Sequence, residues 1–165
     1  MKITNLDELT NLVKVYFKDE SSKINKEEEL FMKEQIKDAI KQIEGATHKL
    51  KEMALSELKS WGYTSFHGEI ELVSFVCESL SNEDRTQLIS SYLKTDKVVK
   101  NHLLEMLDYL PKEMIVNVLN KARPADLIRI MGEINESSKD RSQSRSNRKY
   151  YKYYYNIFRE TLLKK

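Results

Sequence analysis

Glycine and proline are scarce in this chain: its 165 residues contain four Gly and two Pro. Turns depend on these two residue types, and all-β folds need many turns. Their scarcity therefore disfavours a β-rich fold and favours helices joined by short polar links. Because 40% of the residues are hydrophobic and 33% are charged, the composition is that of a folded protein. We expect an all-α fold.

Cysteine and long hydrophobic runs are also nearly absent. The one cysteine, Cys77, excludes an intrachain disulfide. Its place in the run LVSFVC predicts a small buried side chain, with a reactive thiol as the alternative. No hydrophobic run approaches the ~18–20 residues that cross a bilayer, and the start MKITNLDEL lacks a signal-peptide core. We expect a cytoplasmic protein that makes no membrane contact.

Motifs of known chemistry are missing as well: HExxH, GxGxxG, GxSxG, CxxC and the phosphate-binding GxxxxGKS/T do not occur. His102 and Glu105 have the spacing of a helical metal-ligand pair, but a zinc site needs three or four ligands. The sequence thus predicts no metal, no cofactor and no enzyme activity. Catalysis that uses Cys77 or His102 is the least favoured alternative.

Residues 1–61 are predicted to form an N-terminal helical hairpin. The first helix ends near residue 20, and the second spans 26–61 as the longest element. Its apolar side chains recur at steps of three and four in a broken heptad: Ile36, Ile40, Ile43, Thr47, Leu50, Ala54, Leu58 and Trp61. We interpret it as a helix packed on its own domain, with a homodimeric coiled coil as the alternative. Gly45 marks a kink or a split into two helices.

Residues 62–136 are predicted to form an array of short antiparallel helices within the same compact unit, giving about seven or eight helices in all. The segment GYTSFHG at 62–68 breaks the chain. Each later helix start is a capping side chain or a proline at a first helical position, and the starts fall at Ser81, Asp96, Pro111 and Pro124.

Three aromatic residues lie at the joint between these two parts: Trp61, Tyr63 and Phe66. They either fill the joint or form a contact site for a protein partner, because Trp and Tyr are enriched at interface hot spots.

The remaining segment, 137–165, has a charge opposite to that of the body. From Lys139 to Lys165 there are nine Lys or Arg against two acids, which leaves 19 basic and 24 acidic residues before it. We predict a polar, Ser-rich linker over 135–147, followed by a closing helix. On a helical wheel of 141–163, six cations fall in a sector about 100° wide: Arg141, Arg145, Arg148, Lys149, Lys152 and Arg159.

Aromatic and apolar residues fill much of the rest of that wheel, so we expect one face to dock and the other to present cations. Nucleic acid could meet the cations through phosphates or the tyrosines through stacked bases. An acidic protein, or the acidic body itself, could also pair with the cations. We favour a non-enzymatic binding or regulatory protein whose six cations contact nucleic acid or a nucleoprotein complex. The alternative is a protein-binding adaptor or inhibitor that acts through its helical surface.

Overall fold

The fold is built from α-helices throughout the described residues. The computed structural model describes residues 3–18, 26–60 and 67–164, and these form nine helices and no strand. The prediction of an all-α protein is therefore confirmed. The helices are α1 (Leu6–Lys18), α2 (Lys26–Gln42), α3 (Ala46–Ser60), α4 (His67–Ser79), α5 (Asn82–Leu93), α6 (Lys100–Leu107), α7 (Lys112–Leu119), α8 (Pro124–Lys139) and α9 (Arg145–Leu163).

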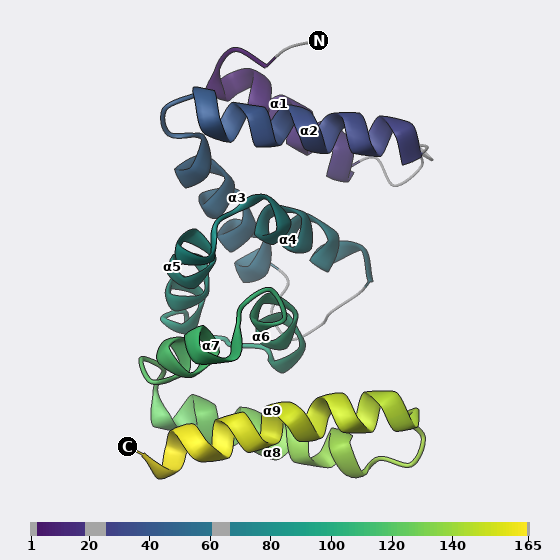
Figure 1. Ribbon diagram of the computed structural model, residues 1–165, viewed down its shortest axis with the longest axis vertical. Coiled ribbons are helices and arrows are strands. Elements are labelled where there is room, and N and C mark those ends of the chain that lie inside the picture. Colours follow the sequence, from purple (N-terminus) through teal and green to yellow (C-terminus); the bar gives the residue numbers. More distant parts are fainter. Residues whose placement is uncertain (1–2, 19–25, 61–66, 165) are drawn as a thin grey trace.

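The helices succeed one another along the long axis of the molecule (Figure 1). α1 and α2 lie at one end, α3 to α7 form the middle, and α8 and α9 form a hairpin at the other end, where the C-terminus lies. One hydrophobic core runs through all three parts, from Ile3 to Phe158. α9 packs along α8 and touches α7. The closing helix therefore lies at an extremity of the molecule.

The segment 26–60 forms two helices, so the prediction of one long helix is wrong and the alternative split at Gly45 is confirmed. Gly45 lies in the turn between α2 and α3 and has φ +84°, a left-handed conformation that suits a residue without Cβ. The apolar stripe of this segment is buried in the chain's own core: Ile36, Leu50, Ala54 and Leu58. A homodimeric coiled coil would have to displace that packing.

Three of the four predicted helix starts are confirmed. The hydroxyl of Ser81 accepts a hydrogen bond from the Asp84 amide at 3.2 Å and caps α5. Pro111 precedes α7, and Pro124 is the first residue of α8. The fourth start, Asp96, is wrong because α6 begins at Lys100.

Side chains from distant positions hold residues 94–99 outside a helix. The Val99 amide donates to the hydroxyl of Tyr92 at 2.7 Å. Arg129 donates to the Val98 carbonyl at 2.6 Å, and Arg123 donates to the Thr95 carbonyl. Backbone groups that a helix would have paired internally thus find tertiary partners.

The connection between α8 and α9 is shorter than the linker predicted over 135–147. That prediction is wrong for most of these residues, which are helical. α8 continues to Lys139, and only residues 140–144 separate the two helices. Buried Ile134, and a hydrogen bond from Lys100 Nζ to Ser137 Oγ at 2.8 Å, tie this polar end of α8 to the fold. Ser144 then caps α9, since its hydroxyl accepts from the Asn147 amide at 3.1 Å.

Candidate nucleic-acid interface

The inner face of α9 is apolar and aromatic, as the wheel predicted. Tyr154, Ile157 and Phe158 are buried, and Thr161 is buried beside them. The rings of Tyr150 and Tyr154 meet edge to face, with centroids 5.2 Å apart. This face fixes the helix to the core and leaves the opposite face for other contacts.

Asp108, the residue that ends α6, anchors two tyrosines of α9. The Tyr150 hydroxyl donates to Asp108 Oδ2 at 2.8 Å, and the Tyr154 hydroxyl donates to Oδ1 at 2.6 Å. Burial, and then the hydrogen bond and charge of Asp108, raise the pKa of both phenols well above 10.0. Both therefore remain protonated donors near neutral pH. No local pattern indicates Asp108, which precedes Tyr150 by 42 residues.

The other tyrosines of α9 differ in their exposure. Tyr151 is half-buried beneath Lys100, whose ammonium lies 5.0 Å from the ring centroid. Tyr155 is half-buried as well, whereas Tyr153 is 45% exposed. A base-stacking surface built from several tyrosines would thus have one clearly exposed ring.

Four of the six predicted cations share the outer face of α9: Arg145, Lys149, Lys152 and Arg159. All four side chains are exposed, and we call them the cation row. At 1.5 Å per residue the row is roughly 21 Å long. None of the four forms an ion pair with a carboxylate in the described part of the chain. The described carboxylates of the body therefore do not neutralise the row through direct pairing.

The other two predicted cations occupy different positions. Arg141 lies in the turn before α9, so its predicted place on the helix is wrong, although its side chain is exposed. Arg148 is half-buried at the edge of the row, and its Nε is buried without a hydrogen-bond acceptor among the described residues. The structure thus reduces the six cations to four on one open face, one at its edge and one beyond its end.

The start of α9 has an unfavourable charge arrangement. Arg145 and Arg148 occupy its first turn, which contains no acidic residue. The positive end of a helix dipole disfavours cations there by about 0.3–1 kcal/mol each. α1 and α5 instead begin with acidic pairs, such as Glu83 and Asp84 in α5, whereas α3 and α6 resemble α9 in having no acid in the first turn. Like charges one turn apart, as at Arg145 and Lys149, add a further cost of about 0.2–0.5 kcal/mol.

Cys77 and His102, the residues of the alternative that involves catalysis, are both buried. Cys77 is fully buried, and burial raises the pKa of its thiol to about 12, so the prediction of a buried side chain is confirmed. His102 is also buried, while Glu105 accepts a hydrogen bond from Ser74 at 3.0 Å. Within the described ranges, no three or more His, Cys, Asp or Glu residues are grouped so that they could hold a metal ion.

The predicted protein-contact residues Trp61, Tyr63 and Phe66 lie outside the described residues. Exposed large hydrophobic side chains occur elsewhere, at both ends of the molecule: Leu30 and Phe31 on α2, Ile128 on α8, and Tyr153 and Leu163 on α9.

Comparisons with known proteins do not indicate a function for this chain. No family model, curated protein or solved structure matches the chain. Among the described helices, none has the length and apolar character that crossing a bilayer requires.

Proposed function

We propose that the protein binds nucleic acid through the phosphate backbone and that the cation row of α9 is its contact surface. The row is exposed, lies at an extremity of the molecule and has no carboxylate partner among the described residues. Each cation that meets a phosphate releases condensed counterions, which favours binding with little dependence on base sequence. The proposed activity is therefore strongly salt-dependent.

One observation carries this proposal: the cation row is exposed without a carboxylate partner among the described residues, and it begins where a cation weakens its own helix. Arg145, the first member of the row, lies at the positive end of the α9 dipole and also repels Lys149 one turn away. An arrangement selected for stability alone would place acids there, as α5 does. Local departures from such rules are expected at functional sites.

The geometry favours duplex nucleic acid over a single strand. Single-strand binders stack successive bases on exposed aromatic rings. In α9, Tyr150 and Tyr154 are instead engaged by Asp108, and Tyr153 is the most exposed of the five rings. A straight row of cations suits a duplex, which carries one charge per about 1.7 Å of its axis.

Charge reversal of the cation row tests the proposal. The variant Arg145→Glu, Lys149→Glu, Lys152→Glu and Arg159→Glu should bind a fluorescein-labelled 20-base-pair duplex about a hundredfold or more weakly at 50 mM salt. Its circular dichroism and its resistance to heating should not decline, because Arg145→Glu places a carboxylate in the first turn of α9. Fluorescence anisotropy and thermal melting measure the two effects.

A second variant separates the row from net charge. Lys37, Lys41, Lys112 and Lys121 are exposed and lie on the body, so their replacement with Glu changes the total charge equally. This control should retain most of the duplex affinity. Equal losses of duplex affinity in the two variants would show that binding depends on the total charge and not on the row. Unchanged binding after charge reversal of the row would refute the proposal.

A protein-binding adaptor is the second candidate, and it is favoured by a different observation. Leu30 and Phe31 are adjacent on α2 and are 59% and 53% exposed. Contiguous exposed apolar side chains mark surfaces that meet a partner, and these two neighbours would form the centre of such a surface. An adaptor of this kind would act from the end of the molecule opposite α9, so reversal of the cation row would leave its activity intact.

A further inference from the structure

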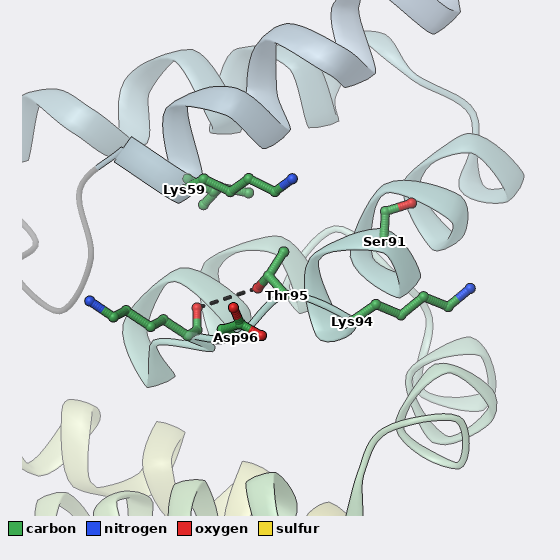
Figure 2. Close-up of a pocket in the computed structure, with 7 residues that line it drawn as sticks. Lys59, Ser91, Lys94, Thr95 and Asp96 are labelled. Atoms are coloured by element: carbon green, nitrogen blue, oxygen red, sulfur yellow. Dashed lines mark hydrogen bonds between the residues drawn. The ribbon is translucent and has the colours of Figure 1, made fainter.

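A cavity of about 550 Å³ lies in the middle of the molecule, between the end of α3 and the end of α5 (Figure 2). Leu58 and Lys59 contribute from the last turn of α3, Ser91 contributes from α5, and the turn of residues 94–97 completes the lining. Figure 2 shows Lys59 facing the labelled residues of α5 and this turn across the opening. The volume falls within the range of about 300–1,000 Å³ that small-molecule sites occupy.

Three lysines line this cavity, which we call the lysine cavity. They are Lys59, Lys94 and Lys97, and Asp96 is the one carboxylate among the described lining residues. Lys59 and Lys94 have exposed side chains and form no ion pair or hydrogen bond with the described residues. A dianion bound in the opening would be attracted by these ammonium groups.

The wall that carries Lys94 and Lys97 is fixed by hydrogen bonds. The Thr95 amide donates to the Tyr92 carbonyl at 3.0 Å, and the Thr95 hydroxyl donates to the same oxygen at 2.6 Å. Arg123, from the start of α8, donates to the Thr95 carbonyl. A ligand would therefore meet a preformed backbone and would order fewer groups on binding.

We propose that the lysine cavity binds a small molecule that carries a phosphate group. Lys59 and Lys94 contact the phosphate oxygens through charge-assisted hydrogen bonds, and the Ser91 hydroxyl supplies a neutral donor. Leu58, which is buried, gives an apolar surface for the remainder of the ligand. No residue of the cation row takes part, so the proposal does not depend on the function assigned to α9.

Isothermal titration calorimetry of the full chain with inorganic pyrophosphate tests this site, with sodium chloride keeping the ionic strength constant. We expect saturable binding of one pyrophosphate per chain and at least about tenfold weaker binding after Lys59→Ala with Lys94→Ala. The matched control, Lys112→Ala with Lys121→Ala, removes two exposed lysines elsewhere and should bind as the wild type does. Circular dichroism verifies that both variants are folded.

Three results would overturn the proposal: no saturable binding, equal weakening in the control, or unchanged binding after loss of Lys59 and Lys94. The charge-reversal variant of α9 should bind pyrophosphate normally, which keeps the two proposed sites distinguishable. Loss of duplex affinity in the Lys59 and Lys94 variant, together with no pyrophosphate binding, would assign these lysines to the nucleic-acid surface and would also overturn the small-molecule site.

Discussion

The arginines of the central helices and the cations of α9 are used in opposite ways. Arg85 donates to the carbonyls of Cys77 and Tyr109, the latter at 3.1 Å. Arg123 and Arg129 donate to carbonyls of the turn between α5 and α6. The four members of the cation row have no such acceptor among the described residues.

The difference follows from which end of a helix lies nearby. Arg85 sits beside the C-terminal ends of α4 and α6, where carbonyls have no intrahelical partner. Arg145 opens α9, where the backbone presents amides and a positive dipole. The first arrangement gives the Tyr109 carbonyl a donor and gives the Cys77 carbonyl a second donor beside the Leu80 amide. The second arrangement leaves the cations available to anions outside the protein. A count of basic residues does not distinguish these two arrangements.

Removal of Arg85 is the largest expected perturbation. Arg85→Met retains the aliphatic stem but loses the hydrogen bonds to the ends of α4 and α6, and it loses the guanidinium 5.6 Å from the Tyr109 ring centroid. The free energy of unfolding should fall by about 2–4 kcal/mol, because hydrogen bonds from charged donors contribute about 1.5–3 kcal/mol each and do not add fully. Urea denaturation followed by circular dichroism measures it.

Arg159→Met is the matched control for that measurement, since Arg159 is exposed on α9 and has no acceptor among the described residues. Its effect on stability should remain within about 0.5 kcal/mol. Similar effects of the two substitutions would abolish the distinction between carbonyl-bound and outward cations.

Alkaline pH tests the contact that joins α9 to the central helices, in which Tyr150 and Tyr154 bind Asp108. The folded state raises the pKa of Tyr150 and Tyr154 above 10.0, so their contribution to stability is complete below pH 10 and declines as the pH rises toward the folded-state values. From pH 9 to pH 11 the wild type should lose about 2 kcal/mol more than Tyr150→Phe with Tyr154→Phe. Urea denaturation at both pH values provides the comparison.

Tyr153→Phe provides the control, because that ring is 45% exposed and its hydroxyl has no hydrogen bond to a described carboxylate. It should reproduce the wild-type decline. If the double Phe variant declined as steeply as the wild type, Asp108 would not hold these phenols in their protonated form.

Local patterns in the sequence predicted much of this arrangement. Ser81, Pro111 and Pro124 define helix starts through their own side chains, and Gly45 marks a backbone position that other residues avoid. The helical period also separated the docking face of α9 from its cations, because both faces arise from a single helix.

Long-range partners account for the predictions that were wrong. Asp96 looked like a cap, but Arg123 and Arg129 bind the carbonyls of its segment from about 30 residues away. The polar end of α8 resembled a linker because its tie to Lys100 is tertiary. Spacing along one helix likewise could not show that Arg148 is half-buried or that Asp108 binds two tyrosines.

The smallest expected effect is the loss of one outward cation, and salt dependence makes it measurable. If Lys152 contacts a phosphate, Lys152→Ala should reduce the slope of log affinity against log salt by about 0.9. Arg129→Ala should leave the slope unchanged, because that guanidinium is engaged by Val98, Asp126 and Glu133. Anisotropy titrations of the same duplex between 50 and 200 mM salt resolve the difference. The slope for Lys152→Ala could remain unchanged while the charge-reversal variant loses binding. In that case binding would depend on the summed electrostatic field of the helix and not on discrete phosphate contacts.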